Sequence, residues 1–202
     1  MLKKKCMMLL VVIILLLVGC AKESVELYEA ESPLLSETVE EYYGELGITA
    51  DVRQNAEAVY ETYIIRDSKE VTVRLPEYWE NIYTIQARNG ITVYEKFNYD
   101  LAGQWGMGQL WSITAKTHDE FKEIAVEYND AYAEVLFANC VVIGSDNTYV
   151  YLLWLPTDVR FVPEVKHAWD YYKAAMANKD KFITDFLEVN EITINEKAPK
   201  IN

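Results

Sequence analysis

Side chains capable of chemistry follow an apolar run at residues 149–155. Asp158 and Arg160 come directly after this run, and His167 follows further along the chain. An aspartate paired with a histidine can move protons, so one hypothesis is a hydrolase that uses Asp158 and His167. The alternative is a turn closed by the Asp158 carboxylate, with Arg160 in a surface ion pair. The chain contains no Gly-x-Ser-x-Gly segment to supply a hydrolase nucleophile.

Trp105 is the third candidate, and it lies in the glycine-rich segment 103–108. Phosphate-binding loops lead from a strand into a helix, whereas these glycines precede a predicted strand. We therefore expect a loop or bulge here. An exposed tryptophan could stack on a cell-wall sugar or line an interface. If this segment and Asp158 share one end of a sheet, Asp158, Arg160 and Trp105 would frame a shallow binding groove.

The cysteines and histidines predict neither a metal site nor a cofactor. Cys6 and Cys20 lie in the N-terminal segment, and Cys140 lies in an apolar run where a buried, unreactive thiol is expected. His118 and His167 are far apart, and neither has the spacing of a metal-binding motif.

The first twenty residues resemble the signal peptide of a bacterial lipoprotein. Three lysines precede an apolar run at residues 7–18, and Leu17-Val18-Gly19-Cys20 resembles a lipobox, whose cysteine is acylated. A membrane-spanning helix needs about 20 apolar residues, more than this run offers. We predict a signal peptide at 1–19, palmitate or a related lipid on Cys20, and a tether at 20–32. The predicted location is the outer face of the cytoplasmic membrane; a secreted form and an uncleaved anchor are the alternatives.

The charge of the chain restricts its partners. The formal net charge is −13, and removal of three signal lysines would make the mature chain more acidic. Such a protein is not expected to bind nucleic acid or anionic lipid headgroups. Simple solubility explains the charge, and attraction of cations or basic partners is the functional alternative.

Two helices are predicted before the sheet, as a helical hairpin. The first begins at Ser32-Pro33, and the second extends from about Thr49 to Tyr63. Apolar residues recur every three or four positions, at Leu35, Val39, Tyr42 and Leu46 and then at Val52, Ala56, Val59 and Tyr63.

The rest of the chain predicts an α+β domain with a mostly antiparallel sheet packed by helices. Asn89-Gly90 between two alternating segments predicts a hairpin with a type I′ turn. The apolar run 149–155 should be a central strand covered on both faces. Strands are expected at 71–75, 83–88, 91–97, 110–116, 134–143 and 149–155, with a weak edge strand after 191, and helices at 117–128, from 163 to about 176, and around 182–187. Residues 33–202 are predicted to form a single domain.

Several segments resemble a group of uncharacterised secreted or lipid-anchored proteins of Gram-positive, clostridia-like bacteria. The matching segments are 71–79, 89–94, 108–113 and 155–161, within a resemblance that covers about 71 to 187. A strand that ends in Leu-Pro-x-x-Trp is also faintly similar to PsbP-like extrinsic proteins. That similarity implies an antiparallel sheet between helices and a non-enzymatic role in binding or assembly. The chain is thus expected to be a membrane-anchored, non-catalytic module for a protein or cell-envelope partner, with the hydrolase as the alternative.

The lipid anchor gives the first testable prediction. Replacement Cys20→Ala removes the acylated thiol, and the protein should leave the membrane fraction because several acyl chains contribute about 0.8 kcal/mol per buried CH₂. Membrane fractionation with immunoblotting measures this, and globomycin should have the same effect. Unchanged membrane association in both experiments would contradict the anchor.

Overall fold

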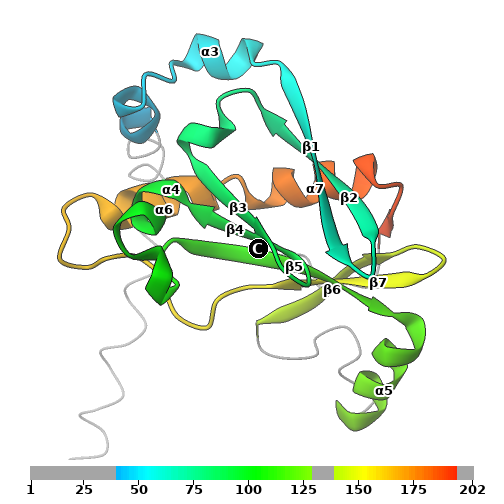
Figure 1. The fold of residues 1–202 in the computed structure, drawn as a ribbon. Coiled ribbons are helices and arrows are strands. Elements are labelled where there is room, and N and C mark those ends of the chain that lie inside the picture. Colours follow the sequence, from blue (N-terminus) through cyan, green and yellow to red (C-terminus); the bar gives the residue numbers. More distant parts are fainter. Residues whose placement is uncertain (1–39, 129–138, 195–202) are drawn as a thin grey trace, which may run out of the picture. The chain divides into compact units, whose positions relative to one another are not determined.

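The computed structural model describes residues 40–128 and 139–194 (Figure 1). The chain divides after residue 37, and all described residues belong to the part that follows. The predicted signal peptide, the lipidated Cys20 and the predicted tether lie outside the described residues, as does most of the first predicted helix.

The fold is α+β, as predicted, and its centre is a six-stranded antiparallel sheet of order β3-β4-β5-β7-β6-β8. A second, two-stranded antiparallel sheet pairs β1 with β2. The strands are β1 (Ala58–Arg66), β2 (Lys69–Pro76), β3 (Tyr83–Ala87), β4 (Ile91–Glu95), β5 (Gln109–Thr117), β6 (Cys140–Ser145), β7 (Tyr149–Trp154) and β8 (Thr193–Ile194).

Helices cover both faces of the large sheet. Residues 40–45 are helical, and the following helices are α3 (Ala50–Asn55), α4 (Lys96–Ala102), α5 (His118–Tyr128), α6 (Ala168–Met176) and α7 (Lys179–Val189), with short 3₁₀ turns η1 (Trp79–Asn81) and η2 (Gly103–Trp105). Figure 1 shows α7 beside the β1–β2 hairpin and α5 beyond the end of β5. The main core lies between the large sheet, this hairpin, α6 and α7.

Strand β7 is central and buried on both faces, as its apolar sequence predicted. Tyr151 and Leu153 join the main core, whereas Leu152 packs on the opposite face with Phe121 and Ile124 of α5. Because both faces are covered, this strand needs no polar side chain between its ends.

The second predicted N-terminal helix is corrected by the structure. Helix α3 ends at Asn55, and Ala58–Arg66 forms strand β1 instead of continuing the helix to Tyr63. Val59 and Tyr63 are four residues apart, which fits a helical stripe as well as the inner face of a strand. The strand is favoured over the helix because β1 pairs with β2 along its length. The β-branched and aromatic residues of this segment also favour a strand.

The Asn-Gly hairpin is confirmed, but its loop has three residues and not the two of a type I′ turn. Ala87 pairs with Ile91, and Arg88 N donates to Gly90 O at 3.0 Å. Gly90 has φ +154°, and a Cβ added there would lie 2.5 Å from Ile113 O of the neighbouring strand. Glycine is therefore required by close approach as well as by backbone conformation.

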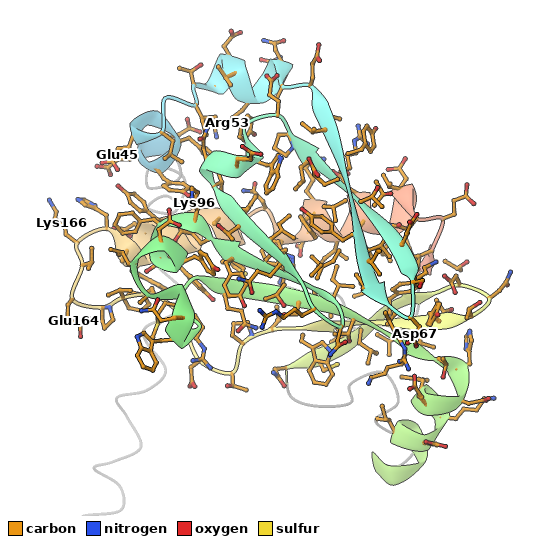
Figure 2. The ribbon with its side chains drawn as sticks, viewed as in Figure 1. Glu45, Arg53, Asp67, Lys96, Glu164 and Lys166 are labelled. Carbon is orange, nitrogen blue, oxygen red and sulfur yellow. The ribbon has the colours of Figure 1, made fainter. Side chains whose placement is uncertain are left out.

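Helix α6 begins later than the sequence predicted, at Ala168 in place of residue 163. His167 has φ 68°, a left-handed conformation that interrupts the helix. Residues before it form an exposed loop, with Glu164 and Lys166 at its outer side (Figure 2). The apolar spacing of this segment predicted the helix, but not the turn that precedes it.

A buried polar pair, Glu95 and Asn98, joins several of these elements. The Glu95 carboxylate caps α4 by accepting from Phe97 N at 2.7 Å and Asn98 N at 2.8 Å, and it also accepts from Asn98 Nδ2 at 2.7 Å. Tyr42 OH donates to the same carboxylate at 3.3 Å. Both side chains are fully buried, so these bonds replace water that neither group can reach.

Asn98 extends this network to the loop before α6. Its Nδ2 donates to Ala168 O at 2.8 Å, and its Oδ1 accepts from Val162 N at 2.8 Å. The backbone of Glu95 in turn binds the glycine segment, because Glu95 N donates to Gly108 O at 2.7 Å. A Cβ on Gly108 would lie 2.5 Å from Glu95 O, so only glycine fits this approach. Residues distant in sequence are thereby fixed around one buried carboxylate.

Two charged contacts hold the tip of the β1–β2 hairpin. Arg66 binds Glu120 of α5 with two parallel bonds of 2.6 Å, and Lys69 Nζ lies 3.1 Å from Asp146 Oδ2. The Arg66 hydrogen bonds lower the pKa of Glu120 to about 2. Burial alone would raise the pKa of Asp146, but hydrogen bonds from Tyr151, Thr148, Tyr149 and Lys69 lower it to about 2.

The lowered pKa of Asp146 predicts loss of stability in acid. A carboxylate whose pKa falls on folding stabilises the folded state fully above its unfolded pKa, here 3.8, and this contribution disappears as the pH falls to about 2. The variant Asp146→Asn should therefore lose less unfolding free energy than the wild type between about pH 5 and pH 2. Urea unfolding at several pH values measures this. Asp158→Asn is the control, because Asp158 makes no hydrogen bond within the described residues; equal acid losses in Asp146→Asn and the wild type would refute the prediction.

Candidate functional site

The glycine segment and the turn after β7 lie together, as the antiparallel pairing of β5 and β7 requires. Gly108 N donates to Arg160 O at 2.5 Å. Trp105 is 74% exposed on the same segment. Trp105 and Arg160 therefore belong to neighbouring segments at one end of the sheet.

Asp158 and His167 are not joined by a hydrogen bond or ion pair in the part of the chain that the structure describes. Asp158 is exposed, whereas His167 Nδ1 lies 3.9 Å from Asp170 and its ring stacks on Tyr171. Arg160 is half-buried, and its Nε has no acceptor among the described residues. The hydrolase hypothesis stays a prediction. His167, on which it depends, lies beside the carboxylate of Asp170 and not beside that of Asp158.

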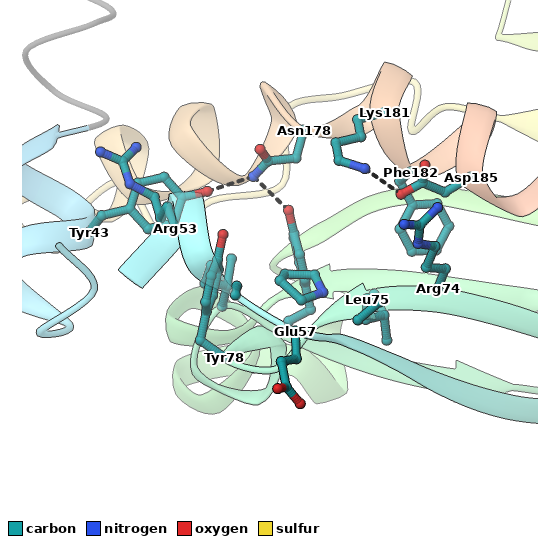
Figure 3. Close-up of a pocket in the computed structure, with 15 residues that line it drawn as sticks. Tyr43, Arg53, Glu57, Arg74, Leu75, Tyr78, Asn178, Lys181, Phe182 and Asp185 are labelled. Carbon is teal, nitrogen blue, oxygen red and sulfur yellow. Dashed lines mark hydrogen bonds and ion pairs between the residues drawn. The ribbon is translucent and has the colours of Figure 1, made fainter. Parts of the chain in front are cut away.

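A cavity of about 270 Å³ lies elsewhere in the domain, between α7, the β1–β2 hairpin and the segment from helix 40–45 to α3 (Figure 3). Its lining combines aromatic and aliphatic side chains with five charged residues and one asparagine. The lining residues include Tyr43, Arg53, Arg74, Tyr78, Tyr83, Asn178, Lys181, Phe182 and Asp185. Ligand sites in proteins commonly have this composition.

Asn178 stands at the centre of the cavity wall, in the turn between α6 and α7. Its Nδ2 donates to Tyr43 Oη at 2.7 Å and to Tyr83 Oη at 2.8 Å, and Tyr83 OH donates to Ala175 O at 3.3 Å. Burial raises the pKa of both tyrosines, so their hydroxyls are neutral near pH 7. The amide thus fixes two aromatic walls that come from different parts of the chain.

Arg53 forms one end of the cavity. Its guanidinium lies over the Tyr43 ring, 4.6 Å from the centroid, and forms an ion pair with Glu40. The Tyr78 ring meets the Tyr43 ring edge-on at 6.3 Å. The bond to Arg53 lowers the pKa of Glu40, and Arg53 Nε is buried without an acceptor in the described residues.

The other end of the cavity carries Arg74, Lys181 and Asp185. Lys181 Nζ lies 2.5 Å from Asp185 Oδ2, one helical turn away on α7. Arg74 is half-buried and has no ion pair or hydrogen bond to its side chain among residues 40–128 and 139–194. Figure 3 shows Arg74 beside Phe182 at this end and Arg53 at the opposite end, with Asn178 between them.

The sequence did not point to this cavity. Tyr43 is next to a predicted helical stripe, Arg74 alternates with apolar residues in β2, and Asn178 lies in the turn between two helices. The alternation of Arg74 with Val73 and Leu75 was visible, but it indicates only a solvated strand face. Contacts between segments more than 90 residues apart, such as Asn178 with Tyr83, create the site.

Comparison of the chain with protein-family models, with curated proteins and with solved structures gave no match. The resemblance to Gram-positive lipid-anchored proteins and to PsbP-like proteins therefore stays a prediction. Within the described residues, no group of three or more His, Cys, Asp and Glu side chains is arranged to hold a metal ion. None of the described helices is long and apolar enough to cross a membrane.

Proposed function

We propose that the chain is a non-catalytic, lipid-anchored binding protein at the outer face of a bacterial cytoplasmic membrane. Its binding site is the cavity between α3, β2 and α7, and its partner is a small component of the cell envelope. The observation that carries this proposal is the composition of the cavity, in which aromatic walls adjoin polar groups, among them Asn178 and Arg53, which are held by hydrogen bonds or an ion pair. The predicted signal peptide and Cys20 supply the location.

Preorganisation supports a binding role for the cavity. Asn178 fixes Tyr43 and Tyr83 through two hydrogen bonds, and Arg53 is held against Tyr43 by Glu40. Side chains fixed before the ligand arrives lose little conformational entropy on binding. Trp105 and Asp158, by contrast, are exposed at the end of the sheet, so they offer a surface and not fixed walls.

The chemistry of the polar groups favours binding over catalysis. A general base needs a proton affinity near the working pH and access to the substrate. The cavity tyrosines have raised pKa values, and the Asp185 carboxylate is bonded to Lys181. These groups are suited to hydrogen bonding and charge recognition.

A blocked cavity tests the proposal. Ala58 lines the cavity at the start of β1, and Ala58→Trp would place an indole there; Thr62→Trp, further along the exposed side of the same strand, is the matched control. The neutral probe 4-hydroxyphenylacetamide should bind the wild type and Thr62→Trp with a dissociation constant of roughly a few millimolar, as expected for about 0.3 kcal/mol per non-hydrogen atom. Binding to Ala58→Trp should be at least about tenfold weaker.

Amide chemical-shift titration by NMR measures this binding, with shifts expected at Tyr83, Asn178 and Phe182. Urea unfolding of both variants checks that they fold. Absence of shifts in the wild type at these residues, or equal binding by Ala58→Trp, would contradict the proposed site.

A further inference from the structure

We infer that the ligand of this cavity is a small organic carboxylate with one ring, whose anionic end binds Arg74 and whose other end offers a hydrogen-bond acceptor to Arg53 and Tyr43. This inference rests on the proposed binding function of the cavity, and it names the chemical class of the ligand.

Among the described residues, one cation of the cavity has no anionic partner. Arg53 is paired with Glu40, and Lys181 is paired with Asp185, but Arg74 has no such partner within the described ranges. A half-buried guanidinium without an anion has lost part of its hydration without a compensating contact. A carboxylate can accept two parallel bonds from a guanidinium, which makes it the best-fitting partner for Arg74.

Glu57 does not supply this anion. It lines the cavity rim from the segment before β1, but its side chain is exposed and forms no ion pair in the described part of the chain. Figure 3 shows its carboxylate pointing away from Asn178 and the tyrosines. The half-buried charged side chains that line the cavity are Arg53, Arg74 and Asp185, with a formal net charge of +1, because Glu57 and Lys181 are exposed. The cavity is therefore positive, although the whole chain has a formal net charge of −13.

Hydrogen-bond donors at the Arg53 end of the cavity lack acceptors within the described residues. Arg53 Nε is buried without an acceptor, and the Tyr43 hydroxyl accepts from Asn178 but donates to no acceptor among the described residues. Buried donors are normally paired, so an acceptor atom of the ligand is expected here. The amide oxygen of Asn178 likewise has no donor in the described structure. A ligand hydroxyl could accept from the unpaired donors and donate to this amide oxygen.

The cavity is small. Its volume of about 270 Å³ is slightly below the range of drug-sized sites. One ring with a short acidic side chain fits this room. The rings of Tyr78 and Phe182 provide flat apolar contacts for it.

The test compares 4-hydroxyphenylacetate with its neutral amide, 4-hydroxyphenylacetamide, by NMR titration of the full domain. The two probes have the same size and ring, and they differ in charge. The carboxylate should bind about tenfold more tightly, since a hydrogen bond to a charged group contributes about 1.5 kcal/mol or more. Arg74→Gln should remove this preference, so that the carboxylate binds Arg74→Gln no more tightly than the amide does. Arg88→Gln, an exposed cation in the β3–β4 loop, is the control and should keep the preference.

The outcomes separate this inference from the function on which it rests. Equal affinity for the two probes, or a preference that persists in Arg74→Gln, overturns the carboxylate assignment while the cavity remains a binding site. If neither probe shifts the resonances of Tyr83, Asn178 and Phe182, both the inference and the proposed site fail. A loss of preference in Arg88→Gln as large as that in Arg74→Gln would show a general charge effect and also overturn the assignment.

Discussion

The structure depends on one buried carboxylate. Glu95 is fully buried at the end of β4, and burial raises its pKa while hydrogen bonds from Asn98, Phe97 and Tyr42 lower it. An uncompensated buried charge is strongly unfavourable, so these donors must remain in place in the folded state. Tyr42 lies in the helix at 40–45, and Phe97 and Asn98 lie in α4. Asn98 also accepts from Val162 N in the loop before α6, so this requirement constrains all three segments together.

Glu95 contributes to the position of both candidate binding regions, the cavity and the Trp105 segment. Tyr42 donates to Glu95, and its neighbour Tyr43 forms one wall of the cavity. On the other side, Glu95 N binds Gly108, whose own N–H binds Arg160 at the end of the sheet. The cavity wall and the Trp105 segment are therefore attached to the same buried residue, the first through its carboxylate and the second through its backbone N–H. A loss of the carboxylate network would loosen the cavity wall.

Local patterns in the sequence predicted most elements of the fold, and contacts between distant elements account for the differences. Alternation identified β2, β3 and β4, and a strand was expected at the position of β5. The apolar run at 149–155 correctly predicted that β7 is central. Local patterns could not distinguish strand β1 from a helix, because Val59 and Tyr63 fit both periods and the partner strand decides. In the same way, the left-handed His167 delays α6 in a way that apolar spacing does not reveal.

The candidate site was less predictable than the fold. From the sequence, Trp105 and Arg160 were expected at one end of the sheet on condition that their strands are antiparallel neighbours, and the structure shows that their segments are neighbours. The sequence did not reveal the cavity, because Arg53, Arg74 and Asn178 have no motif and lie in α3, β2 and the turn before α7, which meet only in the folded chain. Isolated polar residues in strands and turns carry no local signal of a shared pocket.

Native-state hydrogen exchange tests the central claim most directly. The amides of Phe97 and Asn98 are bound to the Glu95 carboxylate, and that of Val162 is bound to Asn98. If the buried network holds the domain together, these three amides will exchange only when the whole domain unfolds, with the same free energy as the core amides of β7. Exchange of these amides at a much lower free energy than β7 would contradict the claim, because the network could then open while the rest of the fold stays intact.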